Sequence, residues 1–109
     1  MEIKYIIKQE AQEMLKSGSI IMVDVREPEE FELYRVEGNN IINIPLKKIT
    51  ESLTYLAGFS KIICICRTNR RATEAASVLA RAGIKEVYVV KEGVTGWLFD
   101  EYSNKQKTL

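Results

Sequence analysis

The chain has 109 residues with no histidine and only two cysteines, which excludes a Ser-His-Asp triad, histidine metal ligands and a four-cysteine zinc site. Hydrophobic residues make up 46% and charged residues 28% of the chain, which is typical of one soluble globular domain and too apolar for a disordered chain. The formal net charge of +1 gives no global sign of a nucleic-acid or membrane surface, and we expect no metal or other cofactor.

The first predicted elements are a strand, a helix and a second strand. Residues 3–6 are expected to form a strand. An apolar face at helical spacing follows, made of Ile7, Ala11, Met14 and Leu15. Gly18 fits the end of that helix, because glycine is common directly after helices. The nearly continuous apolar run 20–25 predicts a strand that is buried on both faces of a parallel sheet.

The middle of the chain predicts a short helix, a strand and a longer helix. Pro28 suits the first position of a helix whose apolar face would consist of Phe31 and Tyr34. Residues 41–44 predict a strand that the following proline ends. Apolar residues then recur at helical spacing and predict one continuous helix up to Gly58; they are Leu46, Ile49, Leu53 and Leu56.

The last third of the chain contains the clearest strand. Residues 61–66 are apolar at their core without alternation and are expected to form a central strand. A helix ending near Gly83 follows, with small residues on one face: Ala72, Ala75, Ala76, Leu79 and Ala80. Residues 87–90 predict another buried strand, Trp97 is expected to cap the core, and 103–109 are expected to be a polar, frayed tail.

Strands that alternate with helices indicate an α/β fold with a mostly parallel sheet. We expect one domain over residues 1–102, followed by the tail 103–109. Ligands of open α/β sheets bind beyond the C-terminal ends of the strands. The segments to search for a site therefore follow Val25, Ile44, Cys66 and Val90.

The segment from Cys66 to Ala72 carries the strongest signal for chemistry. It joins the central strand to the alanine-faced helix and contains three arginines. A loop of this size can point several backbone N–H groups at one spot, and a helix N-terminus adds to anion binding. Both the helix N-terminus and nearby arginines favour a thiolate, which would suit attack by Cys66 on an anionic sulfur or phosphorus centre.

The same residues also allow a purely structural interpretation, and the pattern alone leaves the two open. A cysteine at a strand end can be a small buried hydrophobe, and arginines at a helix start can form a solvated face. Cys64 lies one pleat deeper on the same side of the strand and is expected to belong to the core. We expect no disulfide, since the strand would hold Cys64 and Cys66 about 6.6 Å apart.

Four blocks of the sequence together resemble a known family. They are VDVREPEEF at 23–31, NIPL at 43–46, CRTNRR at 66–71 and GVTGW at 93–97. In this order they resemble the single-domain rhodaneses, over residues from about 20 to 100. The resemblance implies a rhodanese-like α/β domain with a five-stranded, mostly parallel sheet and helices on both faces. It also implies a sulfurtransferase that moves sulfane sulfur from a donor such as thiosulfate to cyanide or a thiol, through a persulfide on Cys66.

The length of the loop distinguishes sulfur chemistry from phosphorus chemistry. Related phosphatase and arsenate-reductase domains use a cysteine, five further residues and then an arginine. Here Arg71 ends a Cys-x4-Arg loop, and the next position is Ala72. Because the smaller loop suits one persulfide sulfur better than a tetrahedral phosphate, we favour sulfur transfer.

Two positions depart from the family pattern. Asn69 stands where the family commonly has glycine, and asparagine tolerates a left-handed conformation if the turn requires one. The family's His-Ile-x-Gly-Ala stretch is replaced by residues 35–38, which Asn39 and Asn40 follow as a small insertion. We expect the insertion to alter the rim of the pocket and to leave the nucleophile unaffected.

Cys66 is the predicted nucleophile, and backbone N–H groups of the loop are expected to hold the persulfide. The expected substrate-binding residues are Arg67, Thr68, Asn69, Arg70 and Arg71. Arg67 either attracts an anionic donor at the mouth of the site or is a solvated surface arginine.

Some charged residues near the loop are expected to be mainly structural, and direct substrate contact is the lesser alternative for Arg71. Arg71 closes the loop and would pair with a carboxylate such as Asp24 or Glu30. Asp24 and Arg26 end a strand and are expected to form an ion pair.

Three functions fit these observations: a thiosulfate-type sulfurtransferase, a persulfide carrier that delivers sulfur to a protein partner, and a non-catalytic interaction module. The intact cysteine and the six-residue loop argue against the third, and the sequence does not separate the first two. Expected partners are a small anionic sulfur donor and a thiol or protein acceptor, with no nucleic acid and no membrane. No signal peptide or membrane-spanning run is visible, so the default expectation is a cytoplasmic protein.

Overall fold

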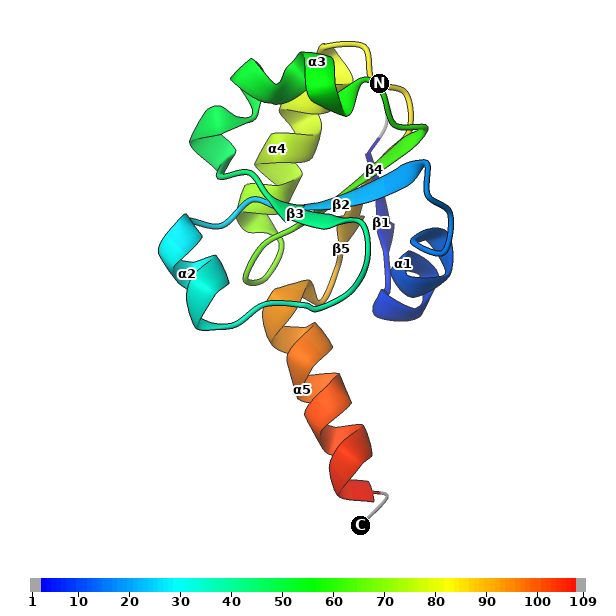
Figure 1. Ribbon diagram of the computed structural model, residues 1–109, viewed down its shortest axis with the longest axis vertical. Coiled ribbons are helices and arrows are strands. Elements are labelled where there is room, and N and C mark those ends of the chain that lie inside the picture. Colours follow the sequence, from blue (N-terminus) through cyan, green and yellow to red (C-terminus); the bar gives the residue numbers. More distant parts are fainter. Residues whose placement is uncertain (1–2, 108–109) are drawn as a thin grey trace.

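Five parallel strands form the centre of the structure (Figure 1). The computed structural model describes residues 3–107. The strands are β1 (Ile3–Ile6), β2 (Ile20–Asp24), β3 (Ile41–Asn43), β4 (Lys61–Ile65) and β5 (Val87–Val90). They lie in the order β1-β5-β4-β2-β3, and every neighbouring pair is parallel, so the predicted α/β sheet is confirmed.

Strand β4 lies at the centre of the sheet, as its apolar run predicts. Its register pairs Cys64 with Val23 on one side and with Val89 on the other. Successive side chains of β4 alternate between the hydrophobic cores on the two faces of the sheet. Cys64 and Cys66 therefore share one face, and Cys66 lies directly after the end of the strand.

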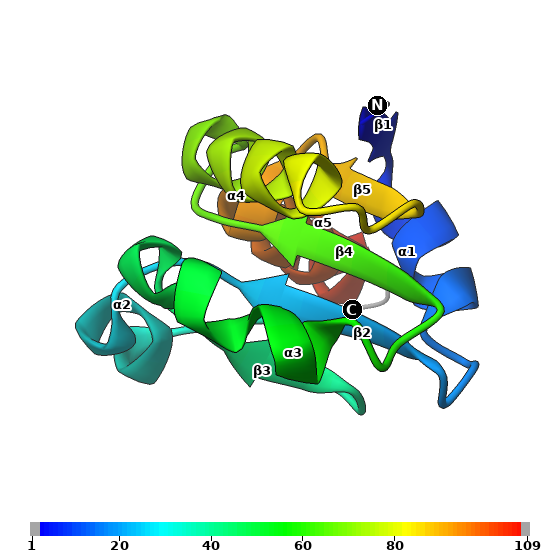
Figure 2. The ribbon, with the colours of Figure 1, turned by 90° about the horizontal axis from the view of Figure 1, so that it is seen from above.

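Helices cover both faces of this sheet (Figure 2). The core on the Cys66 face includes side chains of α4 (Arg70–Arg81), of α3 (Leu53–Leu56) and of the 3₁₀ turn η1 (Leu46–Lys48). The core on the other face includes side chains of α1 (Lys8–Met14) and α5 (Gly93–Lys107). The short helix α2 (Pro28–Leu33) follows β2 and begins with proline, as predicted.

Small residues bring α4 close to the sheet. The predicted apolar face is confirmed, with four fully buried members, Ala72, Ala75, Ala76 and Leu79. Alanine side chains keep the helix axis near the strands, so the first turn of α4 lies close to the end of β4. Gly83 then ends the helix with a φ of 99°, a conformation that glycine adopts without steric cost.

The continuous helix predicted up to Gly58 is wrong. The segment forms η1, a second 3₁₀ turn η2 (Thr50–Ser52) and α3. The N–H of Ile49 donates to the Leu46 carbonyl, and the N–H of Ser52 donates to the Ile49 carbonyl, which is the i to i+3 pattern of a 3₁₀ helix. The Ser52 hydroxyl also donates to the Lys48 carbonyl, a local bond that competes with regular helix.

Helix α2 lacks the buried apolar face that Phe31 and Tyr34 predict, since none of its residues is buried. Arginines cover the two rings instead. The guanidinium of Arg35 lies 5.0 Å from the centre of the Phe31 ring, and that of Arg26 lies 5.0 Å from the Tyr34 ring. These cation–π contacts shield aromatic surface that a larger core would have buried.

The frayed tail predicted after residue 102 is wrong for residues 103–107, which continue α5 beyond the sheet (Figure 1). Residues 108 and 109 lie outside the described part of the chain. The amide of Asn104 bonds to Asp100 one turn earlier, and lysine and glutamine at 105 and 106 favour helix. Within residues 3–107, no helix is long and apolar enough to cross a membrane.

Candidate active site

The loop after β4 lies where open parallel sheets place their ligands. Strands β2 and β4 are neighbours, yet the chain leaves β2 toward β3 and leaves β4 toward β5, on opposite sides. Such divergence opens space at the C-terminal edge of a sheet. Residues 66–69 form the connection from β4, and Figure 1 shows it between α2 and the first turn of α5.

Cys66 begins this loop with its sulfur turned inward. The residue is only 1% exposed, and the N–H of Ala72 donates to its Sγ at 3.2 Å. Within residues 3–107, the N–H groups of 67–71 have no hydrogen-bond partner. Because α4 begins at Arg70, these donors lie at the positive end of a helix dipole. The thiol is thus followed by a run of free backbone donors, an arrangement that binds anions.

The side chains of the five predicted substrate-binding residues differ in exposure. Arg67, Thr68, Asn69 and Arg70 are exposed, and Arg71 is half-buried. Their contact with a substrate stays a prediction. No cluster of three or more histidine, cysteine or acidic side chains that could hold a metal lies in the described part of the chain.

The start of α5 supports the loop from the other side. The N–H of Val94 donates to the Cys66 carbonyl at 2.8 Å, and the N–H of Thr95 donates to the Arg67 carbonyl at 3.1 Å. Gly93 has a φ of 69°, and a Cβ added there would lie 2.1 Å from the Thr68 carbonyl oxygen. Only glycine fits this approach, so the GVTGW block holds the loop.

The sequence places Gly93 in the GVTGW block but does not predict this supporting role. Its signal is a glycine at the start of a helix whose free N–H groups need acceptors. A sequence shows that such acceptors are needed but does not show which loop supplies them.

Asn69 does not take the left-handed conformation that its substitution for glycine suggests. Its φ is −155°, which any residue adopts. Its side-chain amide donates to the Lys91 carbonyl at 3.2 Å, and its own carbonyl accepts the N–H of Thr73 in α4. Asparagine therefore fits the turn without a positive φ, and its side chain adds a tie between the loop and the end of β5.

Arg71 pairs with Glu30, one of the two carboxylates predicted for it. Its two terminal nitrogens lie 2.7 and 3.0 Å from the two carboxylate oxygens, a bidentate contact that joins α4 to α2. The hydrogen bond from Arg71 is the main cause that lowers the pKa of Glu30 to about 2. The pKa of Arg71 is raised in turn, mainly by the bond to Glu30 and to a smaller degree by Cys66 and Asp24.

The predicted ion pair of Asp24 and Arg26 is confirmed and is buried. The Arg26 Nε lies 3.0 and 3.1 Å from the Asp24 carboxylate oxygens, and Nη2 lies 2.9 Å from Oδ2. The same guanidinium donates to the Tyr34 carbonyl at 2.8 Å. The Asn43 amide donates to the carbonyls of both Asp24 and Arg26. The ends of β2, α2 and β3 are thereby fixed to one another beside the loop.

Cys64 and Trp97 belong to the core, as predicted. Burial raises the pKa of the Cys64 thiol to about 12, with a smaller contribution from Cys66. Trp97 is buried on the opposite face of the sheet, and its indole N–H donates to Glu101.

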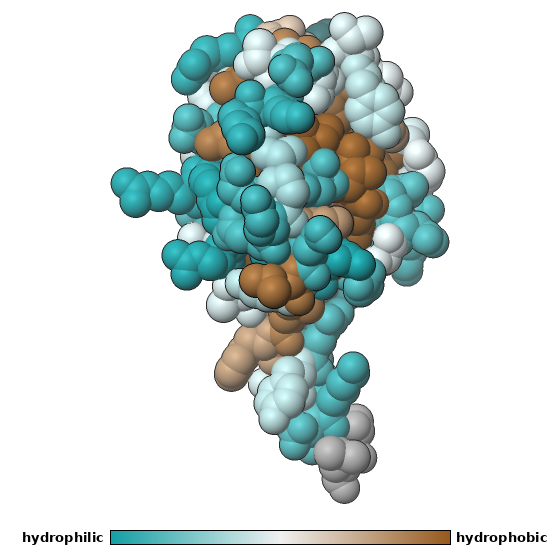
Figure 3. Space-filling model, turned by 60° about the vertical axis from the view of Figure 1, so that its left-hand side comes forward, coloured by the Kyte–Doolittle hydropathy of each residue, from teal (hydrophilic) through white to brown (hydrophobic). Residues whose placement is uncertain are grey.

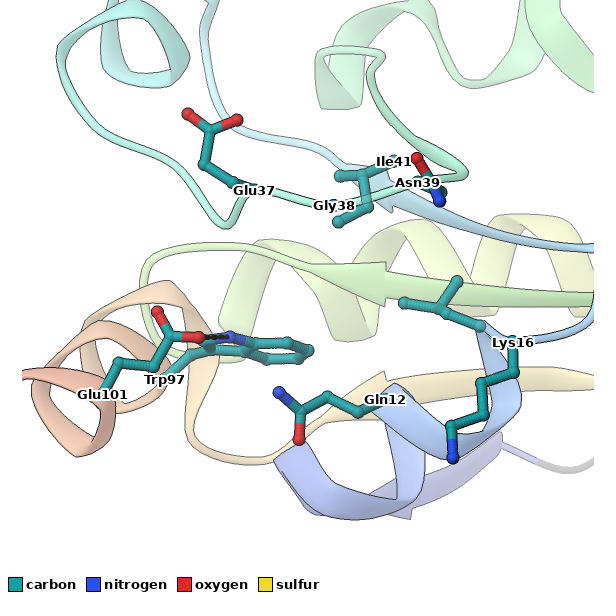
Figure 4. A pocket seen from close by; sticks show the side chains of 9 residues that line it. Gln12, Lys16, Glu37, Gly38, Asn39, Ile41, Trp97 and Glu101 are labelled. Atoms are coloured by element: carbon teal, nitrogen blue, oxygen red, sulfur yellow. Dashed lines mark hydrogen bonds between the residues drawn. The ribbon is translucent and has the colours of Figure 1, made fainter. Parts of the chain in front are cut away.

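Two hollows of the surface lie apart from the loop. One has a volume of about 250 Å³, and Figure 4 shows Gln12 and the Trp97 ring facing one another in it. Its rim includes residues 37–39, so this part of the departing stretch lines a hollow away from the Cys66 loop, and its effect on the rim of the active site stays a prediction. The other, of about 450 Å³, lies among residues 27–29, 43–45, 47–48 and 52. None of their lining residues comes from the 66–71 loop.

Comparison with known proteins finds one family. A family model described as a rhodanese-like domain matches residues 8–100. The chain is 35% identical over 106 residues to a mitochondrial protein of Schizosaccharomyces pombe named for thiosulfate sulfurtransferase, across 83% of this chain and 68% of that protein. It is 29% identical to the thiosulfate sulfurtransferase GlpE of Ectopseudomonas mendocina, across 88% of this chain and 85% of GlpE.

A solved structure and some longer proteins are also similar. The rhodanese-related protein of Thermoplasma volcanium has a TM-score of 0.75 at 26% identity, across 89% of this chain and 92% of that one. YrkF of Bacillus subtilis, named as a sulfur carrier protein, is 33% identical over 72% of this chain. The chain spans 42% of YrkF and 24% of MoeZ of Mycobacterium tuberculosis, so both contain regions without a counterpart here.

The bond between Glu30 and Arg71 predicts how stability depends on pH. The pKa of Glu30 is about 2 in the folded protein and 4.5 ordinarily, so the stabilisation is complete above pH 4.5 and is lost as the pH falls toward 2. We expect Glu30→Gln to lower the free energy of unfolding at pH 7, by a difference that shrinks below pH 4.5. Urea unfolding at a series of pH values measures this difference. Glu29→Gln, exposed on the same helix, is the control, and a difference from wild type that stayed constant down to pH 3 would contradict the account.

The close approach of Gly93 to the loop predicts that a side chain at this position destabilises the protein, and a matched variant at Gly83 isolates this effect. Alanine at either Gly93 or Gly83 would adopt a positive φ, which costs about 1–2 kcal/mol. A Cβ at Gly83 meets no atom within 4 Å, whereas one at Gly93 collides with the loop backbone. We therefore expect Gly93→Ala to destabilise the protein clearly more than Gly83→Ala in thermal or urea unfolding. Equal losses would show that the close approach to Thr68 does not matter.

Proposed function

Since this chain belongs to the rhodanese-like domain family, we propose that it transfers sulfane sulfur by way of a persulfide on Cys66. The observation that carries the proposal is the surroundings of the Cys66 sulfur. The Ala72 N–H bonds to Sγ, and the N–H groups of 67–71 have no other partner within residues 3–107. A sulfur atom added to Cys66 would carry negative charge next to these donors.

The proposed loading step uses thiosulfate as the donor. The Cys66 thiolate attacks the outer sulfur of thiosulfate, the sulfur–sulfur bond of thiosulfate breaks, and sulfite leaves with the electron pair. In the second step an acceptor such as cyanide or a thiolate attacks the outer sulfur of the persulfide, and Cys66 leaves as thiolate. Each step exchanges one bond to sulfur, so no oxidant or reductant is needed.

The surrounding residues have distinct proposed roles. The backbone donors of the loop would hold the charged persulfide, and their fixed positions avoid the cost of reorganising solvent. Arg67, exposed beside the loop, would attract the anionic donor. Arg71 is bound by Glu30 and would act mainly by fixing the loop.

The shape of the loop supports sulfur rather than phosphate chemistry. The position that a longer phosphatase-type loop would give to arginine is Ala72, whose side chain is buried in the core. Arg70 is exposed and starts two positions earlier in the chain, and Arg71 is bound to Glu30, so neither stands in that place. A phosphoryl group would therefore lack the bidentate arginine that usually stabilises it.

A second candidate is a sulfur carrier that delivers the same persulfide to a protein. The similarity to YrkF, named as a sulfur carrier, favours it. Both candidates use the same persulfide and differ in the acceptor. The non-catalytic alternative would need a loop without a usable nucleophile.

Steady-state kinetics with thiosulfate and cyanide test the proposal. We expect parallel double-reciprocal plots, because a persulfide intermediate divides the reaction into two half-reactions. Cys66→Ala should lower the rate by at least about 10³-fold, since it removes the nucleophile. Cys64→Ala, which removes a buried thiol from the same strand, is the matched control and should retain most of the activity. If Cys64→Ala lost the activity and Cys66→Ala retained it, the assignment of the nucleophile would be overturned.

A further inference from the structure

Two apolar side chains lie unprotected on either side of the Cys66 loop. Leu33 and Phe99 are 81% and 70% exposed, more than any other large hydrophobic side chain among residues 3–107. Leu33 lies three residues after Glu30, which binds Arg71 of the loop. Residues three or four apart on a helix are neighbours on one face, so Leu33 lies one turn from that contact.

Phe99 has the same relation to the loop on α5. It lies four residues after Thr95, whose N–H donates to the Arg67 carbonyl. It therefore also lies one helical turn from a residue that contacts the loop. Figure 3 shows one face of the molecule, on which hydrophobic patches lie among hydrophilic ones near the place where α5 leaves the rest of the domain.

The loop and the end of β5 carry positive charge that no ion pair among the described residues balances, whereas the exposed carboxylates of Glu29 and Glu32 lie beside Leu33 on α2. Arg67, Arg70 and Lys91 are exposed, and none of them has an ion-pair partner within residues 3–107. Lys91 is adjacent because its carbonyl accepts the Asn69 amide. The carboxylates of Asp24 and Glu30 are already paired with arginines. The mouth of the loop is thus complementary to negative charge.

A small anionic donor explains the cations but not the leucine and the phenylalanine. Exposed apolar residues around a polar centre are typical of a surface that binds another protein. We propose that Leu33, Phe99, Arg67, Arg70 and Lys91, here called the loop-mouth surface, dock the protein that accepts the sulfur. The partner would present its reactive thiol on an acidic segment with apolar side chains next to it. This inference rests on the persulfide function proposed for Cys66.

Docking of this kind would serve the transfer step. Cys66 is 1% exposed, so a protein thiol must be brought to the loop and oriented before it can reach the outer sulfur. The partner thiolate then forms a new bond to that sulfur, the persulfide bond breaks, and Cys66 leaves as thiolate. The apolar contacts would supply affinity, and the cations would increase the rate of encounter in a manner that salt weakens.

Synthetic peptides with a single cysteine provide a direct test. The first peptide places glutamates and leucines beside the cysteine, the second replaces the glutamates by lysines, and the third replaces the leucines by serines. The full chain is first loaded with thiosulfate, and the second-order rate of sulfur transfer to each peptide and to dithiothreitol is measured. Fluorescein-labelled copies with serine in place of cysteine measure binding without transfer.

The variants separate docking from chemistry. Leu33→Ser with Phe99→Ser, and separately Lys91→Glu, alter the surface and leave the loop residues 66–71 unchanged. Tyr55→Ser is the matched control, because Tyr55 is an exposed aromatic residue on α3, at the opposite end of the domain from α5 (Figure 1). We expect transfer to the first peptide to exceed transfer to the second and third by about tenfold, which corresponds to about 1.4 kcal/mol. Leu33→Ser with Phe99→Ser should lose the preference over the third peptide, Lys91→Glu should reduce the preference over the second, and transfer to dithiothreitol should be unchanged in both.

Each result bears on one claim. Equal rates and equal binding for the three peptides would overturn the docking surface. So would a preference over the third peptide that survives Leu33→Ser with Phe99→Ser, or a preference over the second that Lys91→Glu leaves unchanged. So would a wild-type dimer that the Leu33→Ser and Phe99→Ser changes dissociate, because the surface would then bind a second copy of this chain. If no persulfide forms, the proposed function fails, while the labelled peptides still test the surface by binding alone.

Discussion

The loop after β4 must keep its backbone donors free if it is to bind an anion, and it therefore cannot hold its own shape by bonding to itself. The N–H groups of 67–71 have no partner within residues 3–107. Support comes from outside instead. Arg71 is fixed by Glu30 of α2, and the loop carbonyls accept N–H groups from the first turn of α5. The backbone N–H groups of the loop stay free because other elements bind its carbonyl groups and the side chain of Arg71 instead. This need for outside support explains why the ends of several elements meet at one short segment.

The parallel sheet provides the frame for that support. Because all five strands run in the same direction, the segments that follow β2, β4 and β5 meet at one edge. Arg26, held by Asp24, donates to the carbonyls of Glu30 and Tyr34 and so fixes α2, which in turn presents Glu30 to Arg71. Burying such an ion pair costs desolvation free energy. Here the pair also fixes the position of α2, so its role is not stability alone. The alanine face of α4 completes the arrangement by bringing the Ala72 N–H to the cysteine sulfur.

The sequence predicts most of the strands and helices well, and it predicts contacts between elements that are distant in the sequence less well. The central strand and the alanine-faced helix were predictable because their side-chain periods are strong and local. The pairing of Arg71 could be narrowed to two carboxylates, since charged side chains at adjacent strand ends are few. The break of the segment after Pro45 into 3₁₀ turns was not predictable, because three-residue spacing of apolar side chains fits both kinds of helix. The close approach of Gly93 to Thr68 joins residues far apart in sequence, and no local pattern encodes it.

The central claim is that Cys66 carries one sulfur atom between donor and acceptor. Intact-mass spectrometry after incubation with thiosulfate tests it most directly, since a persulfide adds a single sulfur atom to the protein. The account predicts that this gain appears in the wild type and in Cys64→Ala, is absent in Cys66→Ala, and is reversed by cyanide. A gain that persisted in Cys66→Ala, or phosphate release from an aryl phosphate with no added sulfur in the wild type, would contradict it.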